Sequence, residues 1–255
     1  MKPHQYPPLL QCNDYHFPDI ATAQQERDGL VAIGGDLSVP RLLSAYGQGI
    51  FPWFDEYHPI LWWAFAERMV LKPEALRYGR SLHKALRNRP YYITVNQAFS
   101  RVIRRCARTY RPTQNGTWLT QNMQAAYIDL HRQGFAHSFE YWHQGADGRW
   151  CLGGGLYGVL IGQIFFGESM FTHVDDASKI AFIHSVHFLR TLGVPLIDCQ
   201  VHSEHLARFG AETMPFDAFR QYLDTYCANT TRQTIKPGLI ASNKLPANTP
   251  FTTTQ

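Results

Sequence analysis

Two short polar segments beside apolar, strand-like runs constrain this chain more than any other feature. Glu168 follows the strand-like run 163–166. Asp198 and Gln200 lie within the short apolar segment 195–200. A carboxylate beside a buried strand is unfavourable unless it is paired or takes part in chemistry. Two carboxylates and a glutamine on neighbouring strands therefore predict a site that aligns an amine with an electrophilic carbonyl group.

The composition allows a large folded core. The chain has 255 residues, of which 45% are hydrophobic and only 17% are charged, so it is long enough for one large domain or two smaller ones and is not a disordered chain. No stretch approaches the ~18 uninterrupted apolar residues of a membrane span, and the N-terminus lacks the apolar core of a secretory signal. Five scattered cysteines favour reduced thiols. We therefore expect a cytoplasmic protein without a membrane partner.

The net charge of +4 conceals a strongly basic segment. Residues 77–128 contain no Asp or Glu, whereas the rest of the chain has fourteen basic and twenty acidic residues. The basic residues of the segment are Arg77, Arg80, Lys84, Arg87, Arg89, Arg101, Arg104, Arg105, Arg108 and Arg111. A phosphate backbone is the natural partner of such a segment. The alternative is a basic face that only meets solvent.

Periodicity and turn signals predict a mixture of helices and strands. We expect helices over 38–46, 96–109, 120–133, 176–192 and 216–227. We expect strands over 28–36, 136–142, 151–161, 163–166 and 195–200. The resulting fold class is α+β, with a small N-terminal α/β domain over 1–68, a larger domain over 69–228 and a flexible tail over 229–255.

The glycine run 153–158 invites comparison with a phosphate-binding loop. Such a loop needs a helix directly after it, and the residues that follow this run are strand-like. Glycines inside a strand are typical of a bulge or of a close approach between backbones. We therefore expect a bulge or tight packing here.

Cys199, His202 and His205 suggest two further chemistries. Their spacing is unusual for zinc, and no pair of thiols stands nearby in the sequence, which favours a structural role. Cys199 could also act as a nucleophile with a histidine base. Against this, side chains alternate along a strand, so Asp198 and Gln200 are expected on one face and Cys199 on the other.

A long, ordered set of motifs resembles a known enzyme family. The motifs include Gly34-Gly35-Asp36-Leu37, Gly49-Ile50-Phe51-Pro52-Trp53, Gly116-Thr117-Trp118, Phe166-Gly167-Glu168-Ser169-Met170-Phe171 and Ile197-Asp198-Cys199-Gln200. Over residues ~29 to ~223 the chain resembles the leucyl/phenylalanyl-tRNA–protein transferases. It departs from the family pattern at Ala64-Phe65-Ala66-Glu67-Arg68, where only the arginine of Ser-Pro-Asp-Pro-Arg is kept, and at Met214-Pro215-Phe216.

The resemblance implies a specific activity. Members of this family move Leu or Phe, and less well Met, from aminoacyl-tRNA to the α-amine of proteins that begin with Arg or Lys, which marks those proteins for the N-degron pathway. The implied fold is a small N-terminal domain followed by a GNAT-like (acyl-CoA N-acyltransferase-like) domain. No metal or organic cofactor is implied, and a monomer is expected.

The resemblance and the strand geometry together assign roles to individual residues. Gln200 is expected to hold the attacking amine through its side-chain oxygen, Asp198 to orient the Gln200 amide, and Glu168 to bind the terminal ribose or the amine. The residues expected to bind substrate are Trp53, Trp118, Leu156, Phe165, Gly167, Met170 and Ser178. Those expected to grip the tRNA backbone are Arg80, Lys84, Arg87 and Arg89.

Two other functions compete with this interpretation. An acyl-CoA-dependent N-acyltransferase would have a similar sheet, but it should carry a pyrophosphate-binding loop before a helix, which the sequence lacks. An RNA-binding module without catalysis would not require Glu168, Asp198 and Gln200 beside buried strands.

Overall fold

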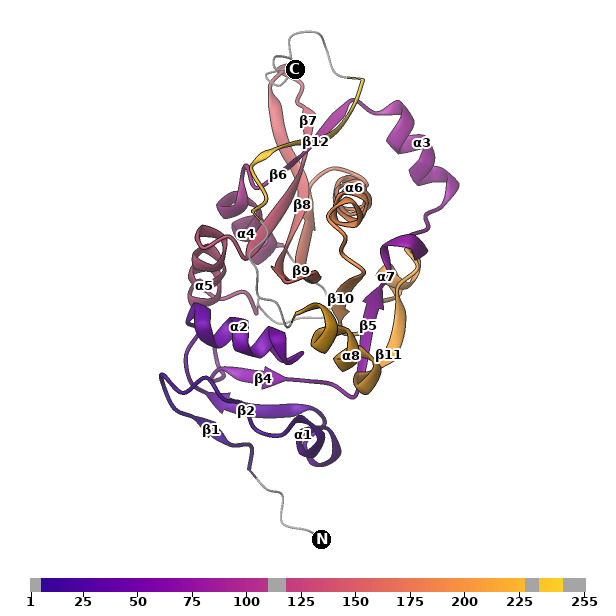
Figure 1. The fold of residues 1–255 in the computed structure, drawn as a ribbon. Coiled ribbons are helices and arrows are strands. Elements are labelled where there is room, and N and C mark those ends of the chain that lie inside the picture. Colours follow the sequence, from indigo (N-terminus) through magenta and orange to yellow (C-terminus); the bar gives the residue numbers. More distant parts are fainter. Residues whose placement is uncertain (1–5, 110–117, 228–233, 245–255) are drawn as a thin grey trace.

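Two β-sheets organise the part of the chain that the structure describes (Figure 1). This computed structural model describes residues 6–109, 118–227 and 234–244. The small sheet has strand order β1-β2-β4-β3, and the large sheet has strand order β11-β5-β10-β9-β8-β7-β6-β12. The predicted α+β class is confirmed.

The small sheet and two helices form the N-terminal unit. Its elements are β1 (Leu9–Leu10), α1 (Ile20–Glu26), β2 (Leu30–Gly34), α2 (Val39–Gly47), β3 (Phe51–Pro52) and β4 (Leu61–Trp63). Asp19 caps α1, because its carboxylate accepts the Thr22 N–H at 2.8 Å. Ser38 is the N-cap residue of α2 as predicted, although its side chain makes no capping hydrogen bond.

The large sheet is antiparallel except at one pair of strands. Its strands are β5 (Glu67–Leu71), β6 (Tyr91–Val95), β7 (Ala136–Gln144), β8 (Trp150–Ile161), β9 (Ile164–Thr172), β10 (Leu196–Gln200), β11 (Glu212–Pro215) and β12 (Gly238–Asn243). β9 and β10 run parallel, and helix α6 (Ala177–Thr191) crosses over between them.

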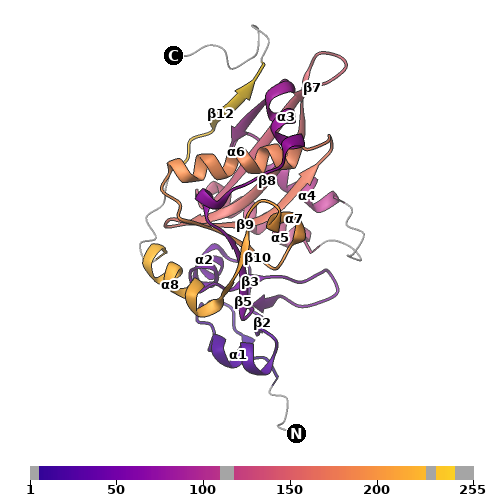
Figure 2. The same cartoon turned by 90° about the vertical axis from the view of Figure 1, so that its right-hand side faces the viewer.

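Helices cover both faces of the large sheet (Figures 1 and 2). The remaining helices are η1 (Pro73–Ala75), α3 (Arg80–Asn88), α4 (Phe99–Arg108), α5 (Gln121–Arg132), α7 (Glu204–Ala207) and α8 (Phe216–Tyr226). One buried cluster contains residues of α3 and α6. A second cluster contains residues of α4, α5, α8 and the N-terminal unit. The four predicted helices from 96 to 227 are confirmed as α4, α5, α6 and α8, and none of the described helices is long and apolar enough to cross a membrane.

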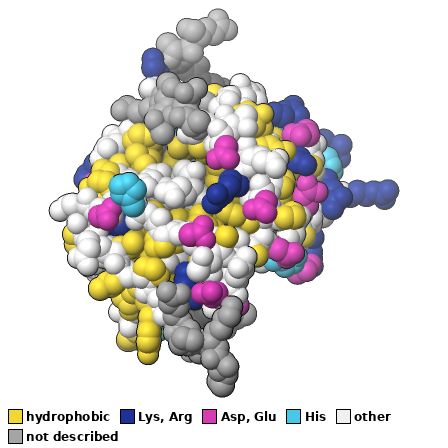
Figure 3. Space-filling view, turned by 60° about the horizontal axis from the view of Figure 1, so that its bottom comes forward, with side chains coloured by type: hydrophobic (Ala, Val, Ile, Leu, Met, Phe, Trp, Pro, Cys, Tyr) yellow, Lys and Arg dark blue, Asp and Glu magenta, His cyan; other side chains and the backbone are white. Residues whose placement is uncertain are grey.

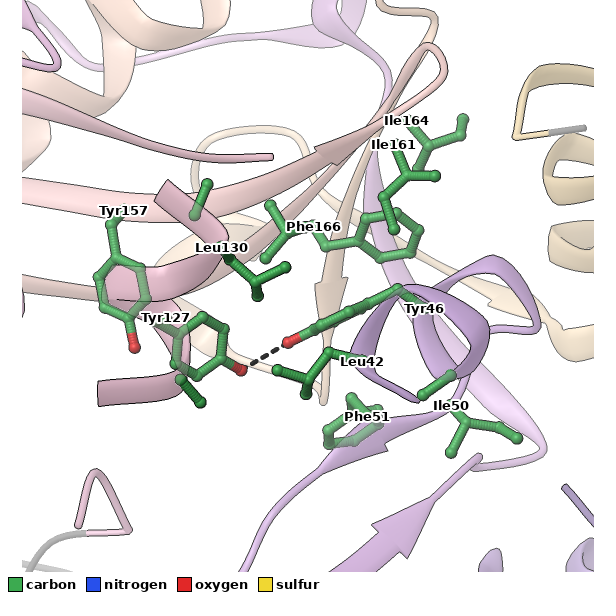
Figure 4. Close-up of a cluster of buried hydrophobic side chains, with 14 of the residues drawn as sticks. Leu42, Tyr46, Ile50, Phe51, Tyr127, Leu130, Tyr157, Ile161, Ile164 and Phe166 are labelled. Carbon is green, nitrogen blue, oxygen red and sulfur yellow. Dashed lines mark hydrogen bonds between the residues drawn. The ribbon is translucent and has the colours of Figure 1, made fainter. Parts of the chain in front are cut away.

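The N-terminal unit packs directly on the larger part of the chain. The second cluster runs without a break from Leu42 and Phe51 to Phe166. In Figure 4, Tyr46 of α2 points toward Tyr127 of α5 within this cluster. The predicted boundary at 68/69 falls inside β5, which pairs with β10 and β11 of the large sheet.

The predicted flexible tail is wrong for residues 238–243. These residues form β12, an antiparallel edge strand that pairs with β6 from Gly238↔Val95 to Asn243↔Tyr91. The sequence of this strand shows no alternation of apolar and polar residues. An edge strand at the surface is held by backbone hydrogen bonds to its neighbouring strand and does not need such a pattern. The rest of the predicted tail lies mostly outside the described residues.

The parallel strands β9 and β10 separate in the middle of the sheet. Their pairing ends at Asp198↔Phe166, although β9 continues to Thr172 beside β8. β10 shifts register against β5 between Asp198 and Gln200, and Gln200 adopts a positive φ of 62°. The backbone therefore turns away from β9 at the residues that the sequence marks as polar, and a gap opens between the strands.

Close packing explains the glycines of β8. An added Cβ at Gly154 would lie 2.6 Å from the Ala177 Cβ, and one at Gly158 would lie 2.3 Å from the Phe166 carbonyl oxygen. The pairing of β8 with β9 also shifts register between Tyr157 and Gly158. The expected bulge and close backbone approach are confirmed, and α6 begins beside Gly154 because that residue lacks a side chain.

Replacing Gly158 with alanine should lower the free energy of unfolding by about 1–3 kcal/mol, because the new methyl group overpacks β8 against β9. The matched control is Gly47→Ala at the end of α2, where an added Cβ meets nothing within 4 Å and alanine favours a helix. Urea unfolding followed by circular dichroism measures both variants. Equal midpoints for the two variants would contradict this account of the packing.

Candidate active site

A cavity of about 380 Å³ lies where β9 and β10 separate. This is the size of a small-molecule site. Its buried part is apolar and its open part is aromatic: Phe182 and Leu189 of α6 are almost fully buried, whereas Trp53 is 38% exposed. The other lining residues are Phe51, Pro52, Trp118, Leu156, Tyr157, Phe165, Gly167, Glu168, Ser169, Met170, Ser185, Ile197, Cys199, Gln200, Val201, Ser203, His205 and Leu206.

Glu168 is the centre of a hydrogen-bond network at this cavity. Its Oε1 accepts from the Tyr46 hydroxyl at 2.6 Å and from Gln200 Nε2 at 3.0 Å. Its Oε2 accepts from the Tyr127 hydroxyl at 2.8 Å, and the two tyrosine oxygens are 2.5 Å apart. The network joins α2, α5, β9 and β10, so the N-terminal unit contributes directly to the site.

The surroundings of Glu168 hold its pKa near neutrality. Burial raises the pKa of Glu168 to about 7, and the negative charge of Asp198 acts in the same direction, while the hydrogen bonds from the two tyrosines oppose the shift. Burial also raises the pKa values of Tyr46 and Tyr127 well above their ordinary range, so both hydroxyls remain protonated donors. A carboxyl group of this kind can gain or lose a proton near pH 7.

Asp198 lies behind the cavity, paired with Arg68. Arg68 donates from Nε to Oδ1 at 2.8 Å and from Nη2 to Oδ2 at 2.7 Å, and both side chains are fully buried. Arg68 Nη1 also donates to the Gly49 carbonyl at 2.9 Å, and the guanidinium lies 4.7 Å and 5.0 Å from the ring centroids of Phe51 and Phe219. The pair therefore links β10 to the N-terminal unit and to α8.

This arrangement corrects the role predicted for Asp198. The carboxylate accepts the backbone N–H of Gln200 at 2.8 Å instead of contacting the Gln200 side-chain amide. The amide donates to Glu168, because the register shift and the positive φ of Gln200 turn its side chain toward β9. Asp198 thus contacts the backbone of Gln200, while Glu168 and Gln200 line the cavity.

The same register shift corrects the orientation predicted for Cys199. Alternation was expected to turn Cys199 away from any site that contains Gln200, but both residues line the cavity. Burial, and secondarily the charge of Asp198, raises the pKa of the Cys199 thiol far above its ordinary value. The thiol therefore stays protonated, and Cys199 is a poor candidate for a nucleophile.

Most residues predicted to bind substrate come together at the cavity, and one does not. Those at the cavity are Trp53, Trp118, Leu156, Phe165, Gly167 and Met170. Ser178 lies outside it, in the first turn of α6, where its backbone nitrogen would be 2.9 Å from a Cβ on Gly154. Ser178 is placed there because α6 packs on the glycine run and not on the gap between β9 and β10.

Sequence reasoning overlooked several residues of the site. The sequence does contain a sign of the importance of Arg68. This arginine directly precedes the apolar run 69–71, and it is the one residue of the family's Ser-Pro-Asp-Pro-Arg motif that this chain keeps. Tyr46 and Tyr127 have no such signal, because a buried tyrosine at helical spacing resembles ordinary core. The wall formed by Phe182, Ser185 and Leu189 could not be separated from the other core positions of α6.

The four residues predicted to bind the tRNA backbone differ in their surroundings. Arg80, Lys84 and Arg87 are exposed on α3. Arg89, which follows the helix, is partly buried; it donates to the Asp175 carbonyl and lies 3.5 Å from the Asp176 carboxylate. Arg89 therefore already has partners within the protein, although Asp176 also accepts from Lys179 at 2.9 Å.

Comparison with known proteins identifies the family. A family model described as leucyl/phenylalanyl-tRNA protein transferase matches residues 70–224, and the model of the N-terminal domain of that family matches residues 35–64. The chain belongs to the leucyl/phenylalanyl-tRNA protein transferase family. The enzyme is thus an aminoacyltransferase, and the hypothesis of an RNA-binding module without catalysis is wrong.

Bacterial relatives support the same family over most of the chain. A leucyl/phenylalanyl-tRNA–protein transferase of Anaeromyxobacter dehalogenans is 57% identical over 78% of this chain and 82% of its own length. The transferases of Chromobacterium violaceum and Neisseria meningitidis serogroup B are 52% and 49% identical, over 80% and 85% of this chain and 84% and 90% of their own lengths. Among solved structures, L-PGS from Bacillus licheniformis aligns with a TM-score of 0.37 at 9% identity over 69% of this chain and 56% of that one, a likeness too low to support an argument.

Replacing Asp198 with asparagine should lower the free energy of unfolding of this transferase by about 3–5 kcal/mol, because Arg68 would be left as an uncompensated buried charge. The matched control is Asp129→Asn, which removes a carboxylate 2.9 Å from Arg132 on the exposed face of α5 and should cost less than about 1 kcal/mol. Chemical denaturation measures both. A similar small loss in both variants would contradict the anchoring role of the Arg68–Asp198 pair.

Proposed function

We propose that this chain transfers Leu or Phe, and less well Met, from aminoacyl-tRNA to the N-terminal α-amine of proteins that begin with Arg or Lys. The product carries a destabilising N-terminus for the N-degron pathway. The observation that carries the proposal is an apolar cavity that meets the Glu168–Gln200 pair, in a chain of the leucyl/phenylalanyl-tRNA protein transferase family. The gap between the parallel strands β9 and β10 is also consistent with a GNAT-like larger domain.

The cavity suits the side chain of the donor amino acid. Its buried walls, including Phe165, Phe182 and Leu189, offer apolar contacts but no charge. A side chain that is not branched at Cβ, such as that of Leu, Phe or Met, fits such a space. The β-branched side chains of Val and Ile should fit it poorly. Trp53 at the open end presents a ring on which the terminal adenine can stack.

The reaction needs alignment and the movement of one proton. The neutral α-amine attacks the ester carbonyl carbon, a C–N bond forms, and the C–O bond to the terminal ribose breaks. The amine loses a proton and the departing ribose oxygen gains one, so no metal or organic cofactor enters the balance. Gln200 donates through Nε2 to Glu168, so its amide oxygen is the atom that can accept from the amine.

Glu168 is the candidate proton acceptor. Its pKa of about 7 means that the carboxylate and the carboxylic acid are both populated near neutral pH. The carboxylate takes the proton as the amine attacks, and the acid can return a proton to the ribose oxygen. Because Asp198 is paired with Arg68 and does not line the cavity, Glu168 is also the carboxylate that faces a cationic Arg or Lys acceptor.

A transfer assay tests the proposed donor and acceptor. With Leu-tRNA and a peptide that begins with Arg, the protein should add one Leu residue, detected by mass spectrometry. The matched acceptors are the same peptide with an acetylated N-terminus and the same peptide beginning with Glu, and neither should react. Transfer from leucyl-CoA but not from Leu-tRNA would support the acyl-CoA-dependent alternative and contradict the proposal.

Replacing Glu168 with glutamine should lower kcat/KM for transfer by about 10²–10⁴-fold, the usual contribution of a general base. In the unmodified protein the rate should rise as pH increases through about 7, because only the carboxylate accepts a proton. This rise in rate near pH 7 should vanish in Glu168→Gln. Any further rise that comes from deprotonation of the peptide α-amine should remain.

Glu140→Gln is the matched control. Glu140 is fully buried, whereas Glu168 is half-buried at the cavity. Burial raises the pKa of Glu140 to about 7 as well, but it accepts from the Ser138 hydroxyl and the Ala98 N–H away from the cavity. The rise in the transfer rate near pH 7 should persist in this variant. If the rise in rate near pH 7 were lost in Glu140→Gln, or if it were kept in Glu168→Gln, Glu168 would not be the proton acceptor.

A further inference from the structure

Helix α4 carries a row of exposed arginines whose charge is not balanced within the described parts of the chain. Arg101, Arg104, Arg105 and Arg108 are all exposed and follow the i, i+3, i+4, i+7 spacing of one helix face, while Val102, Ile103 and Cys106 on the opposite face are buried. Among the described residues no carboxylate lies within ion-pairing distance of this row. Like charges at i and i+4 destabilise a helix, so the row has a cost in the free protein.

Two exposed arginines elsewhere in the molecule are paired with carboxylates. Arg132 lies 2.9 Å from Asp129, and Arg149 lies 2.6 Å from Asp147. The α4 row differs from these two because four arginines without a carboxylate partner among the described residues lie on one helix face. Figure 3, which brings the bottom of the molecule in Figure 1 forward, shows basic, acidic and apolar side chains interspersed over that face, and no continuous basic surface is visible in this view.

Two arginines of the row are held in place by neighbours. The Arg101 guanidinium lies 5.2 Å from the ring centroid of Trp142, and Arg105 Nη1 lies 3.2 Å from His173 Nε2. Burial, with a smaller effect of Arg105, lowers the pKa of His173, so its ring is neutral and can accept from the guanidinium at neutral pH. Fixed guanidinium groups bind phosphate with less loss of conformational freedom than mobile ones.

The row lies on a different face of the sheet from α3. α4 packs on β8 and β9, and β9 also carries Glu168. Trp118, the first described residue beyond Thr109, lines the cavity. The helices α3 and α4 contribute to different buried clusters, and Figure 1 shows them on opposite sides of the large sheet.

We propose that the arginine row of α4 is a second phosphate-binding surface for the RNA of the donor, separate from the basic residues of α3. The inference rests on the proposed function, in which the 3′ end of a charged tRNA enters the cavity. The four arginines extend over roughly 10 Å along the helix and would contact backbone phosphates without reading bases. A donor held from both faces of the sheet would be aligned with the gap between β9 and β10.

The test compares three double variants with equal loss of charge. Arg104→Gln with Arg108→Gln alters the row, Arg80→Gln with Lys84→Gln alters α3, and Arg132→Gln with Arg149→Gln is the control. The row variant should raise KM for Leu-tRNA by roughly three- to tenfold for each phosphate that it no longer binds, and it should make the dependence of log(1/KM) on log salt shallower by about one for each such phosphate. The control variant should leave both quantities unchanged.

A minimal donor separates an RNA contact from a general defect. Leucyl-adenosine carries the reactive ester but no RNA backbone, so the row variant should use it as well as the unmodified protein does. Combining the row and α3 variants should multiply their effects on KM for Leu-tRNA, as expected for contacts at separate surfaces.

Three outcomes would overturn the inference. They are an unchanged KM and salt dependence in the row variant, an equal loss with leucyl-adenosine, and a raised KM for a protein acceptor in place of the tRNA. The last result would make the row a contact for acidic protein surfaces. If the unmodified protein transfers Leu while the row variant behaves like the control, only this inference fails; if the unmodified protein does not use Leu-tRNA at all, the proposed function fails.

Discussion

The buried pair between Arg68 and Asp198 is the interaction on which the rest of the site depends. It joins β5 to β10, and through Gly49 and Phe219 it also holds the N-terminal unit and α8. Asp198 uses the same carboxylate to bind the backbone N–H of Gln200, where the chain takes a positive φ. Without this anchor the backbone N–H of Gln200 would lose its hydrogen-bond acceptor, and the β10 side of the cavity would no longer be held in place.

The two carboxylates of the site have opposite surroundings although they lie on neighbouring strands. Asp198 faces a guanidinium that neutralises its charge, whereas Glu168 receives only neutral donors, from two tyrosines and one amide. Burial without a cation raises the pKa of Glu168 to about 7. Such a division produces one structural carboxylate and one that can exchange protons, a pattern found where a protein needs acid–base chemistry near neutral pH.

The sequence was sufficient to predict the class of fold, a strand that ends just before Glu168, and eight of the residues that line the cavity. The fold class rests on periodicity, and Glu168 and Gln200 rest on polar residues beside apolar runs, which are local properties. The other cavity residues were predicted with the help of the family resemblance. The orientations of Asp198 and Cys199 were wrong because a single register shift reverses the alternation of side chains. The role of Arg68 and the strand β12 depend on partners more than a hundred residues away in the chain, for which local patterns carry little information.

The small N-terminal sheet is part of the chemistry and not only a neighbour of it. Tyr46 reaches Glu168 from α2, while Phe51, Pro52 and Trp53 line the cavity from β3 and the residue after it. If this unit moved away from the large sheet, water would reach Glu168 and its pKa would return toward the ordinary value. The carboxyl group would then stay ionised at neutral pH and would lose its ability to return a proton. The unbroken buried cluster between the two parts of the chain therefore sets the protonation state on which the proposed transfer relies.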